Sequence, residues 1–163
     1  MIAQTAFSPA YFAQKSLAAS LLGTTPRKIE SIEVLGDYAL VLEAGAVYPV
    51  AIELSELETE HDRQRCDRGA GLTVERDGDC WEVTGGDDPH VVYPDPESES
   101  LACDCHDYQR QSEAGRDRPY CKHVAAVELS GRKQLEAIAT DYRALTDEQA
   151  IAAGLVALAD LGF

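Results

Sequence analysis

Four side chains that can bind a metal lie close together in the sequence. Cys103 and Cys105 form one pair, Cys121 and His123 form another, and fifteen residues separate the pairs. Thiolate and imidazole are ligands that zinc prefers in proteins, and two tight pairs at this spacing suit a single ion. Four protein ligands fill a tetrahedron and leave no position for water, so the pattern predicts one structural Zn²⁺ rather than a hydrolytic centre.

The residues around the two pairs indicate how the chain brings these ligands together. Alternate side chains share a face of an extended segment, so Cys103 and Cys105 can reach one ion from a strand tip. Residues two apart do not share a face inside a helix, so we expect Cys121 in a loop and His123 in the first turn of the next helix. Pro119 supports this placement, because the residue before a proline avoids helical geometry. The polar residues 106–120 are expected to form a surface loop whose ends the metal ties together.

The rest of the sequence predicts an α+β fold of antiparallel strands with flanking helices. In the N-terminal half the hydrophobic period and the turn residues predict a helix over 8–22 that Ser8 caps, a three-stranded meander over 29–53, and a helix from a Ser55–Glu58 capping box to about Cys66. Further along they predict a hairpin over 72–83, a strand over 90–94, a helix to Leu129 that Gly131 stops, a second helix over 133–144 and a third from Thr146 to Gly162.

The segment 80–130 resembles a SWIM zinc finger. The Cys-x-Cys pair, the Cys-Lys-His sequence before an apolar helix, and the strands ahead of them are similar to that family's pattern, in Trp81-Glu82-Val83, Val92-Tyr93, Cys103-Asp104-Cys105, Asp107-Tyr108 and Cys121-Lys122-His123-Val124. The resemblance implies a ββα unit with one structural zinc, held by Cys103, Cys105, Cys121 and His123. His106 stands where the family often has proline, and we do not expect it to coordinate.

The resemblance and the predicted elements together divide the chain into three parts. Residues 1–79 would form an N-terminal helix and β meander, 80–132 the SWIM-like zinc finger, and 133–163 a C-terminal helical hairpin. SWIM modules are found beside helicases, transposases, recombination factors and ubiquitin ligases, and they are proposed to bind DNA or protein. The family therefore implies zinc, and a protein or nucleic-acid partner.

Negative charge is concentrated in the middle of the chain. The net charge is −15, and residues 28–100 alone hold five basic and nineteen acidic residues. Such a body repels phosphate backbones, so we expect a protein partner, most simply a basic one or one that itself handles nucleic acid. The alternative is direct DNA or RNA binding through the basic residues in and beside the finger loop, namely Arg110, Arg116, Arg118, Lys122, Arg132 and Lys133.

Other chemistry is less well supported by the sequence. No paired carboxylates or glycine-rich phosphate motif stand out, and the remaining thiols and imidazoles are isolated, so we expect no catalytic residue and no enzyme. We expect Cys80 to pack on a strand face and His61 to be exposed. Three cysteines and a histidine also occur in iron–sulfur proteins of the CDGSH type, but there the histidine follows the last cysteine by four residues rather than two.

The sequence also bears on the cellular compartment. No apolar run reaches the roughly 18 residues of a membrane span, and the N-terminus lacks the pattern of a secretory signal. Clustered cysteines at metal spacing suit a reducing compartment. We therefore expect a cytoplasmic protein, or a nuclear one in a eukaryote, without membrane contact.

Overall fold

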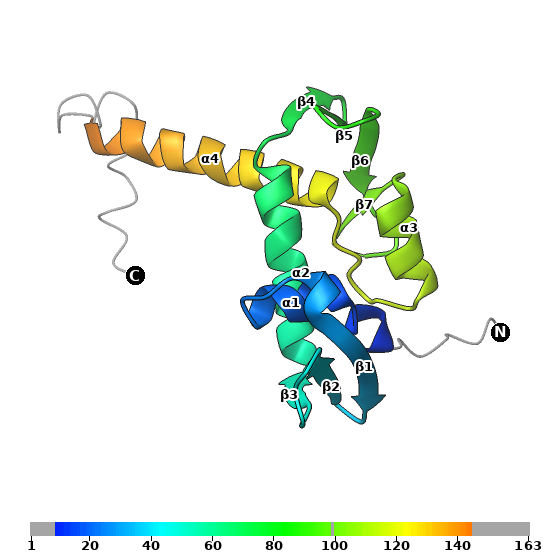
Figure 1. Cartoon of the computed structure of the whole chain (residues 1–163). Coiled ribbons are helices and arrows are strands. Elements are labelled where there is room, and N and C mark those ends of the chain that lie inside the picture. The colour runs from blue at the N-terminus through cyan, green and yellow to red at the C-terminus, as the bar shows by residue number, and fades with distance from the viewer. Residues whose placement is uncertain (1–8, 99, 145–163) are drawn as a thin grey trace, which may run out of the picture. The chain divides into compact units, whose positions relative to one another are not determined.

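The computed structural model describes residues 9–98 and 100–144, and it has the predicted α+β character with antiparallel sheets (Figure 1). Met1–Val127 form one compact unit and Glu128–Phe163 a second. The three-part division at residues 79 and 132 stays a prediction. Among the described residues, no helix is both long and apolar enough to cross a membrane.

A three-stranded sheet forms the core of the N-terminal part. Its strands β1 (Ile29–Leu35), β2 (Tyr38–Glu43) and β3 (Val50–Glu53) pair antiparallel in that order, which confirms the predicted meander. A 3₁₀ turn η2 (Pro26–Lys28) leads into β1. Ten buried side chains from the sheet and its flanking helices form one apolar cluster, namely Phe12, Leu17, Ala18, Ala19, Ile29, Ala39, Val41, Ile52, Leu54 and Leu57.

The single helix predicted over 8–22 is broken in the structure. A 3₁₀ turn η1 (Pro9–Phe12) precedes α1 (Lys15–Leu21), and Gln14 between them is extended, with ψ of 136°. The break lets Phe12 enter the core, where it is 1% exposed, and burial of an aromatic ring outweighs a continuous helix. Ser8, the predicted cap, lies outside the described residues.

Helix α2 (Leu54–Gly69) leads from the first sheet to the second (Figure 1). The predicted capping box does not form, because Glu53 is the N-cap and the Ser55 hydroxyl donates to the Glu53 carboxylate. The expected exposure of His61 is wrong. Its imidazole is 0% exposed and lies edge-on against Phe12, with a 5.2 Å distance between ring centroids.

A second antiparallel sheet precedes the predicted metal ligands. Its strands pair in sequence order and are β4 (Thr73–Asp77), β5 (Cys80–Thr84), β6 (His90–Pro94) and β7 (Leu101–Cys103). The register places Val92 opposite Cys103. Buried Val83, Val92 and Ala102 pack with the cysteines in a second apolar cluster. The predicted hairpin and strand are confirmed, and the expected ββα unit is here preceded by further strands.

The expectation that residues 106–120 form an excursion loop is wrong. Helix α3 (His106–Glu113) occupies the first half of that segment, and Tyr108 and Gln111, one turn apart on it, are buried. The apolar content is too low for a hydrophobic pattern to reveal this helix, because a tyrosine and an amide do the packing.

Helix α4 spans Lys122–Ala144, so Gly131 does not end it and the two helices predicted here are one. The boundary between the two compact units falls inside this helix, after Val127. Residues 145–163 lie outside the described residues. They include the third predicted helix, from Thr146, and most of the predicted hairpin 133–163.

Gly69 at the end of α2 allows a close approach to the first turns of α4. A Cβ atom at this position would lie 2.6 Å from the Lys122 carbonyl oxygen and 2.9 Å from the Ala126 amide nitrogen. Both are backbone atoms, which cannot rotate away as a side chain can. The sequence indicates only that glycine ends a helix here, whereas the structure shows that it also lets α2 pack where α4 begins.

We predict that Gly69→Ala destabilises the protein by about 1–3 kcal/mol, the usual cost of overpacking a tight contact. Gly71→Ala is the matched control, since nothing lies within 4 Å of the position that its methyl group would occupy. Thermal unfolding of the two variants would check this, and an equal midpoint for both would contradict the close approach.

Arg116 joins the segment between the cysteine pairs to α2. Its guanidinium donates to Glu58 Oε1 at 2.9 Å, Asp62 Oδ2 at 2.7 Å and Gln111 Oε1 at 2.6 Å. It also lies 5.1 Å from the centroid of the Phe12 ring. Burial alone would lower the pKa of Arg116, but its hydrogen bonds and charge interactions with Asp62 and Glu58 outweigh that and raise it. Arg116 is therefore a structural cation that connects two elements of the first unit.

We predict that Arg116→Ala lowers the free energy of unfolding by about 2 kcal/mol. Removing one partner of a buried ion pair costs about 3–5 kcal/mol, and partial solvent exposure of the two carboxylates reduces that figure. Arg118→Ala, at an exposed position of the same segment, should change stability little. Urea unfolding measures both, and equal losses would contradict the bridging role.

Candidate metal site

The structure brings the four predicted ligands together. One potential ligand atom from each of Cys103, Cys105, Cys121 and His123 lies within 4.8 Å of all the others. The four residues are between 0% and 4% exposed. Among the described residues, these four form the one group of cysteine, histidine or carboxylate side chains that is placed to hold a metal ion.

Three elements position the ligands. Cys103 is the last residue of β7, and Cys105 is the N-cap of α3, so the Cys-x-Cys pair crosses from a strand tip to a helix. Cys121 directly precedes α4, and His123 lies in its first turn. The predicted placement of the second pair, before and just inside a helix, is confirmed.

Backbone amides of two helices point at two of the sulfurs. The Tyr108 N–H donates to Cys105 Sγ at 3.4 Å, and the Val124 N–H donates to Cys121 Sγ at 3.5 Å. Each sulfur thus accepts from an amide that has no partner within its helix, at the positive end of the helix dipole. Such donors favour the thiolate form, which is the form that binds a metal.

The three thiols also interact with one another. Hydrogen bonds from Cys103 and Cys121 hold the pKa of Cys105 well below its usual range. Hydrogen bonding to Cys105 in turn raises the pKa of Cys103, and burial adds to this increase. Three thiolates so close together repel one another, and a divalent cation is what permits all three to ionise.

The distances in the cluster fit a tetrahedral ion. Nδ1 is the histidine nitrogen that faces the sulfurs, at 3.7 Å from Cys103 Sγ and 4.0 Å from Cys121 Sγ. Bonds of about 2.3 Å to sulfur and about 2.0–2.1 Å to nitrogen place such ligand atoms about 3.6 Å apart. The residues present therefore fit a metal ion that prefers sulfur and nitrogen.

His90 and Asp104 support the cluster, and the sequence did not reveal either role. The His90 ring lies against the His123 ring, with centroids 4.3 Å apart. Asp104 Oδ1 lies 2.9 Å from His90 Nδ1 and accepts from the Val91 N–H at 3.2 Å. The β6–β7 pairing brings His90 and Asp104 together, and the start of α4 places His123 against His90; neither arrangement can be seen in the local sequence.

The remaining candidates lie outside the cluster. His106 is exposed in the first turn of α3 and lies outside the cluster of four side chains. The Cys66 thiol lies 3.2 Å from the Tyr120 hydroxyl, and Cys80 is half-buried at the start of β5.

A cavity of about 460 Å³ adjoins Cys105 and His123. We call it the basic cavity, because Arg65, Arg68 and Lys122 line it together with three imidazoles. The other lining residues are His90, His106, His123, Cys105, Asp88 and Asp107, of which the first three supply the imidazoles. Arg65 is paired with Asp107 at 3.0 Å. Within the described part of the chain, Arg68 and Lys122 form no ion pair with a carboxylate.

Comparison with known proteins gives one finding. Residues 81–131 match the family model of the SWIM zinc finger. The search of curated proteins and the search of solved structures each returned no match. The matched segment starts in β5, ends in α4 and contains all four residues of the cluster. Residues 81–131 of this chain are therefore similar to the SWIM zinc finger family.

Proposed function

We propose that this chain is a non-enzymatic interaction module in which one structural zinc ion shapes a surface that binds a partner protein. The observation that supports it best is the buried cluster of Cys103, Cys105, Cys121 and His123. Four protein ligands complete a tetrahedron, so a zinc ion held by them has no open position for a substrate or an activated water.

The surroundings of the cluster support a structural role for the metal. Its ligands come from the end of β7 and the beginnings of α3 and α4, so one ion would join three separate elements, of which α3 has few apolar side chains of its own. Gln111 reinforces the arrangement, because its amide donates to the Tyr120 carbonyl oxygen at 3.0 Å and accepts from the Tyr120 N–H at 2.9 Å. This pair of bonds fixes the residue directly before Cys121.

Charge favours a protein partner over a nucleic acid. The net charge is −15, and one of the arginines predicted to contact nucleic acid, Arg116, is buried among two carboxylates and an amide. Exposed apolar side chains such as Leu21, Tyr48 and Val50 offer a surface for a protein instead. A reducing compartment such as the cytoplasm would keep the three thiols available to the metal.

We predict that the purified protein contains about one zinc ion per chain, and that Cys103→Ser or a strong chelator removes it. Loss of the ion should loosen the second apolar cluster, against which Trp81 packs. Elemental analysis measures the metal, and the fluorescence of the single tryptophan reports the loosening. Cys80→Ser is the matched control, because Cys80 lies outside the ligand cluster. Unchanged fluorescence after complete metal removal would contradict the structural role.

Capture of a partner tests the proposed function itself. The intact protein, immobilised and treated with nuclease, should retain a partner protein that Cys103→Ser fails to retain and Cys80→Ser still binds. Equal capture by all three forms, or capture only in the absence of nuclease, would overturn the proposal.

The basic cavity favours one alternative function, direct binding of a DNA or RNA backbone. Arg68 and Lys122 lie at a cavity wall beside the finger, and neither is neutralised by a carboxylate within the described residues. Cations placed this way can contact phosphates even on an acidic protein, because screening by salt limits the reach of distant charges.

A gel shift with DNA and RNA at low micromolar protein tests this alternative. If it is right, affinity falls steeply with salt, and Lys122→Gln and Arg68→Gln each lower the slope of log affinity against log salt by about 1. Arg63→Gln is the control, since Arg63 lies outside the basic cavity and is paired with Glu60. No shift at low salt would exclude this function.

A further inference from the structure

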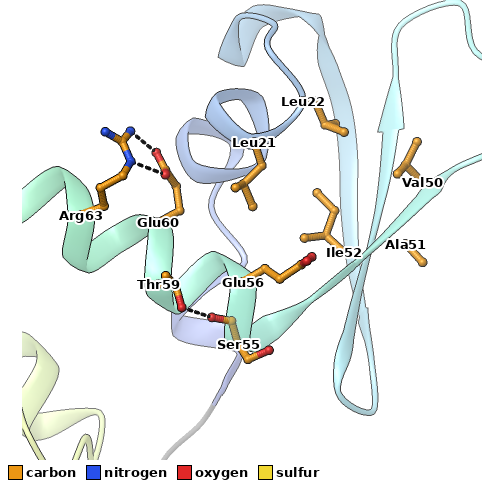
Figure 2. Close-up of a pocket in the computed structure, with 10 residues that line it drawn as sticks. All are labelled: Leu21, Leu22, Val50, Ala51, Ile52, Ser55, Glu56, Thr59, Glu60 and Arg63. Carbon is orange, nitrogen blue, oxygen red and sulfur yellow. Dashed lines mark hydrogen bonds and ion pairs between the residues drawn. The ribbon is translucent and has the colours of Figure 1, made fainter.

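A second cavity, of about 550 Å³, lies in the N-terminal part away from the metal ligands. Figure 2 shows it as a groove between the end of α1, strand β3 and the first turns of α2. Its apolar wall consists of Leu21, Leu22, Val50 and Ile52. Leu21 is 42% exposed and Val50 is 44% exposed. The groove therefore presents aliphatic surface to solvent.

Strand β3 gives this groove a free hydrogen-bonding edge. In the sheet order β1-β2-β3 it is the last strand, so one of its edges has no partner strand in the described part of the chain. Val50 pairs with Val41 and Ile52 with Ala39, and the Leu54 N–H donates to Asp37 O at 2.9 Å. Because hydrogen-bonded positions alternate along an antiparallel strand, the N–H and C=O of Ala51 point away from β2.

The charges at the groove are negative. Glu56 lines it, and Figure 2 shows its side chain beside Ile52. Glu53 is exposed at the end of β3. Neither carboxylate forms an ion pair within the described residues. Glu60 is different, since Arg63 binds it in a fork with distances of 2.7 Å. The unpaired charge at the rim is therefore acidic and complements a cationic occupant.

We propose that this groove binds an extended peptide segment of a partner protein, with alternating apolar and basic side chains, as an added strand along β3. The Ala51 N–H and C=O would bond the added strand, and an apolar side chain would enter between Leu21 and Val50. Lysine or arginine at the alternate positions would lie on the other face of the sheet, on the side of Glu53, while Glu56 adds negative charge at the groove. An exposed sheet edge beside an apolar groove is the usual setting for such strand addition. This inference rests on the proposed function as a protein-binding module and names the surface and the chemistry of the partner.

The probe is a short, blocked, fluorescent peptide of alternating lysine and valine, titrated into the full-length zinc-loaded protein and followed by anisotropy. We expect saturable binding. Ala51→Pro should abolish it, because proline removes the outward N–H while Val50 and Ile52 keep their bonds to β2. Leu21→Ala should weaken it about tenfold, which is equivalent to ~1.4 kcal/mol, whereas Leu35→Ala, 67% exposed on β1, should not.

Control peptides separate the interactions. Replacing lysine by glutamate should abolish binding through repulsion by Glu53 and Glu56. Methylating the backbone nitrogens of alternate residues keeps the charge and the apolar area and removes the strand hydrogen bonds, so it should also abolish binding if the peptide pairs with β3. Circular dichroism and zinc content of each variant confirm that the protein is folded.

Two outcomes would overturn this inference. One is the absence of saturable binding at millimolar peptide. The other is binding that folded Ala51→Pro and Leu21→Ala proteins retain in full. These experiments distinguish failure of the groove from failure of the proposed function. If Ala51→Pro still captures a partner in a zinc-dependent manner, only the groove proposal is contradicted. If capture does not depend on zinc, the proposed function itself is contradicted.

Discussion

The proximity of three thiols and one imidazole in a buried site is the constraint on which the C-terminal half of the first unit depends. Their ligand atoms lie within 4.8 Å of one another, a distance at which ionised sulfurs repel strongly unless a cation neutralises them. The amides of Tyr108 and Val124 supply part of that neutralisation. A zinc ion would supply the rest and would join β7, α3 and α4 at one point.

The metal cluster does not stand apart from the N-terminal sheet. Arg116 connects the segment between the cysteine pairs to Glu58 and Asp62 on α2, and Gly69 at the end of α2 lies against the backbone at the start of α4. Both contacts lie within the unit Met1–Val127. Helix α2 thus contacts the core of the first sheet at one end and the start of α4 at the other. A protein partner at the β3 groove would bind beside the same helix.

The site could be predicted from sequence because ligand type and spacing are local properties, and so could the meander and the second hairpin. Contacts between distant residues could not. Helix α3 cannot be predicted from sequence, because it has no periodic apolar pattern. The Cys105 cap and the hydrogen bond from the Gln111 amide to Tyr120 stabilise it instead. His61 was expected at the surface because its neighbours are polar, yet Phe12 covers its ring. His90 joins the site through strand register alone.

A closed coordination sphere of three sulfurs and one nitrogen is what makes the site structural. X-ray absorption at the zinc edge of the purified protein can detect such a sphere. We predict about three sulfur neighbours at about 2.3 Å and one nitrogen at about 2.0 Å, with no water ligand. A zinc-bound oxygen with fewer than three sulfurs would indicate an open site and contradict the structural role, and a visible absorption band from iron would contradict the metal assignment.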